Sequence, residues 1–207
     1  MKKKILSSSI TGLALALTMS AAIAGPVTRT PIFTDLFDRG GNNTVGNSWV
    51  EINHDAAEVK IVGNALKLSG QATNSLGTVD APDSAVTRTI STLGNYDVNV
   101  QFVWAPLVAS EASDILGFAW KRSIDSTFTN LGTFALGDDG TYGTASFDLG
   151  SLASNTSIDL RFWTNVNEDN EGAMIDSVTV SAVPEPTSLA LLGIGLLGVG
   201  AARRRKS

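Results

Sequence analysis

The middle of the sequence predicts an all-β protein, an antiparallel β-sandwich, flanked by two terminal segments of different composition. Three observations lead to this prediction. Apolar and polar residues alternate with a period of two over many short segments. Turn-forming residues separate these segments at nearly regular intervals. No window between the two ends has the apolar spacing of an amphipathic helix, and no repeat of about 20 to 50 residues indicates a solenoid or propeller.

The N-terminal segment has the three parts of a secretory signal peptide. Lys2, Lys3 and Lys4 form a charged start, Ile10–Met19 is mostly apolar, and Ala22-Ile23-Ala24 has small residues at the two positions that signal peptidase reads. We therefore expect residues 1–24 to be removed after Ala24. The alternative is an uncleaved membrane anchor.

The body, residues 25–183, contains the strand candidates. In Asp97–Trp104, the side chains of Val98, Val100, Phe102 and Trp104 share one face. In Ile158–Thr164, Trp163 lies opposite the apolar face. In Met174–Val180, Asp176 is expected on the same face as Met174 and Val178. The further candidates are Glu58–Val62 and Ala65–Leu68 around the Gly63-Asn64 turn, then Ser84–Ile90, Ile115–Trp120, Thr133–Leu136 and Ala145–Leu149.

The C-terminal segment, residues 184–207, combines a proline motif, an apolar run and a basic tail. Pro184-Glu185-Pro186 comes first, and Leu189–Ala202 holds no charged residue. As a helix that run is about 21 Å long, short of the roughly 30 Å of a bilayer core, and Thr187 and Ser188 extend it to 187–202. The basic tail orients the helix with the body outside the cytoplasm; it consists of Arg203, Arg204, Arg205 and Lys206.

These three parts, in this order at the chain end, resemble the PEP-CTERM sorting signal of exported proteins in Gram-negative bacteria. The resemblance implies recognition by an exosortase, a membrane-embedded protease. It also implies a precursor anchored in the inner membrane and delivery to the cell surface, the exopolysaccharide or the biofilm matrix. The alternative is a plain membrane anchor. Because Pro184 and Pro186 lack N–H donors, we expect an extended hinge outside the sheet, cut near Val183–Pro186.

Two stretches of the body also resemble known folds. Phe33–Arg39 with Trp49 and Val59–Leu68 is similar to the opening of lectin-like jelly rolls. Three later segments are similar to the closing strands of galactose-binding-like jelly rolls, namely Ala145–Leu149, Ile158–Phe162 and Glu171–Val178. The resemblance implies a jelly-roll-type β-sandwich and says nothing of function.

Composition excludes several kinds of chemistry. The chain has no cysteine and a single histidine, His54, so thiolate zinc sites, cysteine nucleophiles and two-histidine metal sites are absent. Residues 25–184 hold 8 basic and 19 acidic residues, a net charge of −11 that disfavours nucleic-acid binding. Gly193–Gly198 fits G-x-G-x-x-G but lacks the strand and the acidic residue of a dinucleotide site.

Candidate sites in the body are few. The acidic stretch Glu168–Glu171 could supply the paired carboxylates of a glycosidase, or it is a solvated loop. Jelly-roll binding modules often hold a structural calcium ion, and the resemblance implies Asp35 or Asp38 and Asp176 as its ligands. The alternative is a hydrogen bond to the backbone or to Arg39.

Tryptophans offer a second kind of site. Trp163, expected on the exposed face, is the candidate platform for stacking a sugar, with inter-sheet packing as the alternative. Trp104 is expected in the core, and the positions of Trp49 and Trp120 are undecided.

The sequence as a whole predicts an exported, non-enzymatic protein of the cell surface or exopolysaccharide matrix. Its expected partners are signal peptidase, exosortase, the membrane before processing, and exopolysaccharide or other surface glycans. Catalytic residues are not expected, and structural calcium is the only cofactor considered. A carbohydrate-binding module and a glycan-active hydrolase are the two alternatives.

Overall fold

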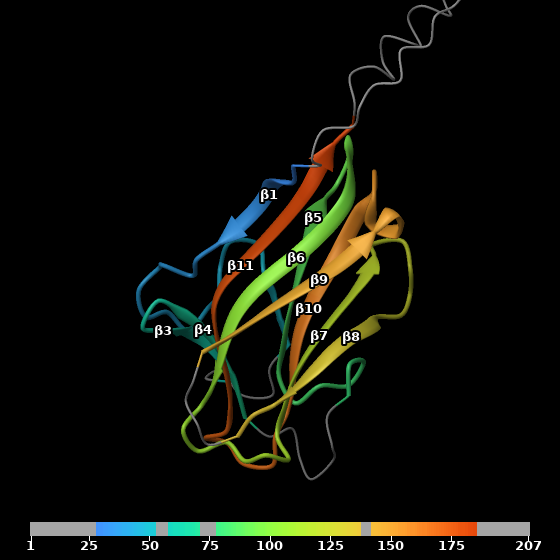
Figure 1. Cartoon of the computed structure of the whole chain (residues 1–207). Helices are drawn as coiled ribbons and strands as arrows, with labels where there is room; N and C mark the ends of the chain where they lie inside the picture. The colour runs from blue at the N-terminus through green and yellow to red at the C-terminus, as the bar shows by residue number, and fades with distance from the viewer. Residues whose placement is uncertain (1–27, 53–57, 71–77, 138–141, 186–207) are drawn as a thin grey trace, which may run out of the picture.

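The computed structural model describes residues 28–52, 58–70, 78–137 and 142–185 (Figure 1). The signal peptide with Ala22 and Ala24, His54, Pro186, the apolar run and the basic tail lie outside these residues. Within the described part no helix is long and apolar enough to cross a membrane. The strands are β1 Thr30–Asp35, β2 Val50–Ile52, β3 Val59–Val62, β4 Ala65–Ser69, β5 Ala85–Ser91, β6 Asn95–Pro106, β7 Ile115–Arg122, β8 Thr129–Ala135, β9 Gly143–Gly150, β10 Ser157–Asn165 and β11 Gly172–Pro184.

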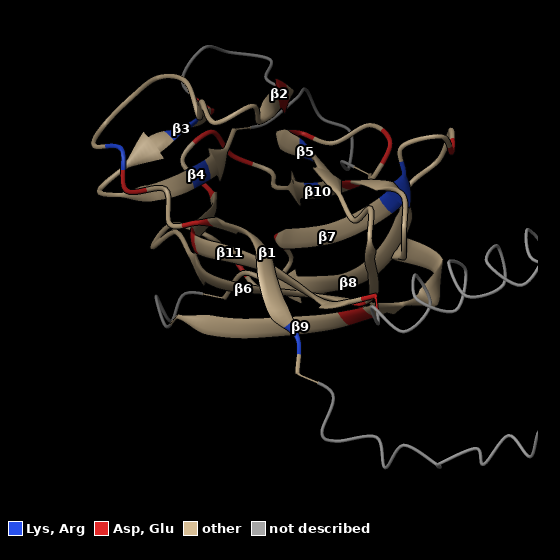
Figure 2. Cartoon of the chain, turned by 90° about the horizontal axis from the view of Figure 1, so that it is seen from above, with Lys and Arg blue, Asp and Glu red and all other residues tan. Residues whose placement is uncertain are grey.

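The strands form two antiparallel sheets, as the alternation predicts. The first has the order β3-β4-β11-β6-β9, with β1 paired to the far end of β11, and the second has the order β2-β5-β10-β7-β8. In the view from above, β10 and β7 lie on one side of the molecule and β6 and β9 on the other (Figure 2). The all-β sandwich is therefore confirmed.

Aromatic rings fill the space between the sheets. Phe102 of β6 meets Phe162 of β10 with ring centroids 4.8 Å apart, and Phe118 of β7 lies 5.1 Å from both rings. All three side chains are fully buried. Trp49 and Trp120 also belong to this core, and Trp104 packs against it.

A bulge in β11 corrects the predicted face of Asp176. The register of β11 against β6 shifts between Ile175 and Ser177, so one residue is inserted without a partner. Ile175 and Val178 both point into the core because of this shift, whereas Met174 is only partly buried and Asp176 is exposed. Strict alternation across Met174–Val180 was the wrong assumption.

The end of β11 corrects a second expectation. Val183 pairs with Tyr96 and Pro184 with Asn95, and the Glu185 N–H donates to the Gly94 carbonyl at 3.0 Å. The sheet thus continues into the first two residues of the proline motif. Proline is tolerated there because it stands at the end of a strand, where one missing donor interrupts little of the ladder.

Candidate functional site

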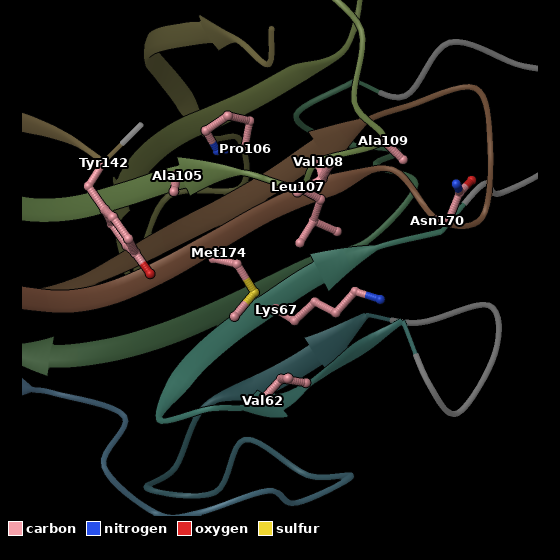
Figure 3. A pocket seen from close by; sticks show the side chains of 10 residues that line it. All are labelled: Val62, Lys67, Ala105, Pro106, Leu107, Val108, Ala109, Tyr142, Asn170 and Met174. Carbon is pink, nitrogen blue, oxygen red and sulfur yellow. The ribbon is translucent and has the colours of Figure 1, made fainter. Parts of the chain in front are cut away.

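An open groove lies on the outer face of the first sheet. Its volume is about 530 Å³, within the range of pockets that bind small ligands. Figure 3 shows Tyr142 at one end and Asn170 at the other, with Met174 and Lys67 between them. The lining residues are Val62, Lys67, Ala105, Pro106, Leu107, Val108, Ala109, Tyr142, Asn170 and Met174, and none of them is acidic.

The register of the sheet explains why these side chains meet. Lys67 of β4 pairs with Met174 of β11, which in turn pairs with Ala105 of β6, so the three form one row across the outer face. Tyr142 precedes β9 and is 58% exposed, and Val108 in the segment after β6 is 82% exposed. The groove therefore has an apolar floor and an exposed aromatic ring at its edge.

One lysine, Lys67, lines this groove, and a second, Lys60, lies beside it on the neighbouring strand. Lys60 of β3 lies directly opposite Lys67 of β4, and the basic parts of both strands are visible in Figure 2. Burial, and then repulsion from Lys60, lower the pKa of the Lys67 ammonium group. Within the described residues neither lysine forms an ion pair with an acidic group. Like charges directly opposite each other destabilise a sheet. An anion bound beside the two ammonium groups would relieve this repulsion.

Trp163 does not form the exposed platform that its position in β10 predicted. It lies on the outer face of the second sheet, yet only 5% of it is exposed. A Cβ at Gly117 of the neighbouring strand would lie 2.0 Å from its indole ring, so the ring covers that glycine. Ala85 and Ala119 complete a small second core around it. Small residues on both neighbouring strands thus allow the indole to lie flat against the sheet.

Asp35 is the centre of a hydrogen-bond network that fixes the loop after β1. Its Oδ1 accepts from the Phe37 N–H at 2.9 Å and from Arg39 at 2.7 Å. Its Oδ2 accepts from Arg39 at 3.1 Å and from Asn47 and the Trp49 indole at 2.9 Å each. Burial alone would raise the pKa of Asp35, but these hydrogen bonds outweigh it and hold the pKa below its ordinary value.

This network bears on the calcium prediction. The Asp35 carboxylate already accepts five hydrogen bonds, and Asp38 and Asp176 are exposed. Among the described residues no group of three or more histidine or acidic side chains could hold a metal ion. Within the described residues the Asp35 carboxylate is thus bound by the backbone and by Arg39, and Asp38 and Asp176 do not join it in an acidic cluster.

The acidic stretch contributes one member of a buried carboxyl pair. Glu168 and Asp169 are exposed, as the solvated-loop alternative predicts, whereas Glu171 is 2% exposed and accepts from the backbone N–H groups of Asn167 and Glu168. Its side chain contacts Asp114, which is also 2% exposed. Burial, together with the nearby charges of Glu171 and Glu111, raises the pKa of Asp114. Neither residue lines the groove, where a glycosidase would need its carboxylates.

This pair makes stability depend on pH. A folded-state pKa above the unfolded value means that the folded chain holds the proton longer, so stability falls as pH rises above about 4. We expect Asp114→Asn to melt at a higher temperature than the parent chain at pH 7 and to lose this advantage near pH 4. Thermal melting of both chains between pH 4 and 8 measures this difference in melting temperature.

The matched control is Asp125→Asn at an exposed ion pair with Arg122, where the pKa of Asp125 is lowered. That variant should show no gain at pH 7. A lower melting temperature for Asp114→Asn at every pH would contradict the repulsion between the two carboxyl groups.

The fold and the groove together define an antiparallel β-sandwich with an open site on one outer face. Comparison with protein families then identifies the chain end: residues 182–206 match the PEP-CTERM protein-sorting motif. The chain thus carries the sorting motif of an exported protein that is processed at its C-terminus. No curated protein matches the chain.

Solved structures share only the general shape. A carbohydrate-binding module in complex with β-1,4-galactotriose is 9% identical, with 65% of this chain and 88% of that chain covered and a TM-score of 0.46. The xylan-binding domain from Paenibacillus barcinonensis Xyn10C is 13% identical, with coverage of 78% and 100% and a TM-score of 0.42. The K3 adhesin domain of Lys-gingipain from Porphyromonas gingivalis is 13% identical, with coverage of 73% and 98% and a TM-score of 0.48.

Sequence reasoning missed the groove but contained a signal for its lysines. A two-residue turn at Gly63-Asn64 fixes the register of its hairpin, and this register places Lys60 opposite Lys67. Tyr142, Asn170 and Leu107 lie in three connecting segments, and no local pattern relates them to Lys67.

Proposed function

We propose that this protein is an exported, non-enzymatic component of the cell surface or exopolysaccharide matrix of a Gram-negative bacterium, sorted by an exosortase. The observation that carries the proposal is the PEP-CTERM match over residues 182–206, which begins inside the last strand of the folded body. The protease would therefore act at the edge of a folded domain.

The pairing of β11 limits where the protease can cut. Proteases bind their substrates as extended backbone, and the backbone as far as the Glu185 N–H is already hydrogen-bonded to β6 and the residue before it. Val183 is also buried. We propose that the first accessible peptide bond is the one between Glu185 and Pro186, so that the mature body keeps its complete β11.

Intact mass of the protein extracted from the surface of producing cells tests this proposal. We expect a mature chain that begins at Gly25, ends at or after Glu185 and lacks Leu189–Ser207. A host without the exosortase should retain the whole C-terminal segment. A surface form that still contains the apolar run would reduce the motif to a simple anchor, and an end before Val183 would contradict protection by β11.

Non-catalytic glycan binding is a second candidate function for the body. Its support is the groove, which combines an exposed tyrosine, an apolar floor and polar groups, with no acidic side chain among the described residues that line it. Sugar rings have apolar faces that pack on aromatic rings and hydroxyl groups that accept and donate hydrogen bonds. Binding without hydrolysis is the activity that such a groove supports.

A further inference from the structure

The groove on the outer face of the first sheet has two chemically different parts. One part is apolar and aromatic, with the exposed ring of Tyr142 and the floor formed by Met174 and Leu107. The other part is cationic: the half-buried Lys67 lines the groove, and Lys60 stands beside it on the next strand. A ligand that satisfies both parts carries an apolar face and a negative charge on one small unit.

These two lysines are positive charges in a body that is otherwise mainly acidic. They are two of only 8 basic residues in residues 25–184, against 19 acidic ones. Most of the other described basic side chains form ion pairs or hydrogen bonds. Arg29, Arg39, Lys121 and Arg122 form ion pairs, and Arg161 donates to Thr87 and to the Val79 carbonyl. Lys60 and Lys67 face each other instead, which raises their energy until a counter-charge is bound.

We propose that this groove binds a carboxylated saccharide, a polyuronate chain, in which the lysines hold the carboxylate and Tyr142 packs on the sugar ring. A pyranose ring presents an apolar C–H face, and a uronic acid adds one carboxylate at its edge. Asn170 at the end of the groove supplies an amide for a hydroxyl group. The inference rests on the proposed glycan-binding role and names its substrate class.

A sugar fits this site better than an extended acidic peptide. The site is a groove of about 530 Å³ with one aromatic ring and one cationic pair, rather than an unpaired sheet edge. Strands β4 and β11, which form its floor, are each paired on both sides over the groove: β4 to β3 and β11, and β11 to β4 and β6. A peptide would therefore find no backbone partners there and would depend on its side chains alone.

The test is affinity gel electrophoresis of the full-length chain in non-ionic detergent at about 0.15 M salt, where long-range repulsion from the acidic body is screened. Three probes are compared: polygalacturonate, neutral dextran and poly-L-glutamate. We expect polygalacturonate to retard the protein most. Lys67→Gln should weaken that binding about tenfold, the usual effect of losing a charge-assisted hydrogen bond. Tyr142→Ala should weaken it as well, and Tyr142→Phe should not.

The matched control is Arg122→Gln, which removes one positive charge from the other sheet and should leave binding unchanged. Lys67→Gln should also melt no lower than the parent chain, since it removes repulsion from Lys60. Equal binding of poly-L-glutamate would overturn the saccharide assignment, and equal binding of dextran, or an unaffected Lys67→Gln variant, would overturn the role of the carboxylate. Equal binding of dextran, or an unaffected variant, would leave glycan binding itself standing, and none of the three outcomes bears on sorting. The absence of binding to all three probes would overturn both the inference and the glycan-binding role. Sorting is tested separately, by the intact mass of the surface-extracted protein.

Discussion

Replacing Asp35 with alanine should lower the free energy of unfolding by about 3–5 kcal/mol, because the buried carboxylate accepts five hydrogen bonds and each buried donor left without an acceptor costs about 1–3 kcal/mol. The Arg39 guanidinium and the Trp49 indole would each lose their acceptor. Trp49 packs against Phe37 and Phe162, so the loss also reaches the core. For a domain of this size we expect the melting temperature to fall by roughly 10 °C.

The control for this variant is Asp38→Ala, three residues away and exposed. It should change stability by less than about 0.5 kcal/mol. Both variants and the parent chain are melted with calcium and with a chelator. Equal melting temperatures in the two buffers are expected. Calcium that raises the melting temperature of the parent chain but not of Asp35→Ala would restore Asp35 as a metal ligand.

The same network predicts the response of the protein to acid. The pKa of Asp35 is lower in the folded chain than in the unfolded chain. The contribution of Asp35 to the stability of the folded chain is therefore complete above about pH 4, and it is lost as pH falls through the folded pKa. The difference in stability between the parent chain and Asp35→Ala should shrink below pH 4, and a difference that grows there would contradict the network.

Replacing Gly172 with alanine should lower the free energy of unfolding by about 3–5 kcal/mol, from backbone strain and steric overlap together. Gly172 begins β11 with φ of +145°, a conformation that side chains disfavour. A Cβ there would lie 2.0 Å from the Leu68 carbonyl oxygen, which belongs to the paired strand β4 and cannot rotate away. Its own backbone also bonds Leu107 and Ser110, so movement would disturb the segment after β6.

Gly137→Ala is the matched control, because a Cβ there would meet no atom within 4 Å. The free energy of unfolding of both variants is measured by chemical denaturation, with tryptophan fluorescence as the signal. A Gly172→Ala chain as stable as the control would show that the start of β11 can shift without loss. Because Gly172 lies between Asn170 and Met174, the variant should also lose binding at the groove.

Much of the fold follows from local pattern. Alternation over short segments placed the main strands of both sheets, and the Gly63-Asn64 turn placed a hairpin where β3 and β4 lie. Such signals are local because side chains on a strand point alternately to its two faces. The sorting motif was readable for the same reason, since its proline motif, apolar run and basic tail follow one another along the chain.

The candidate groove and the side chains around it depended on relations between strands. A bulge against β6 turned Asp176 outward, and Gly117 on the adjacent strand allowed Trp163 to lie flat and buried. Asp114 and Glu171 meet from two separate loops. The groove takes Lys67, Leu107, Tyr142 and Met174 from four segments that only sheet order brings together. The sequence by itself thus determined most of the strands and the sorting motif at the end of this protein. The tertiary structure decided which side chains face one another, because register and burial depend on neighbours that are distant in the chain.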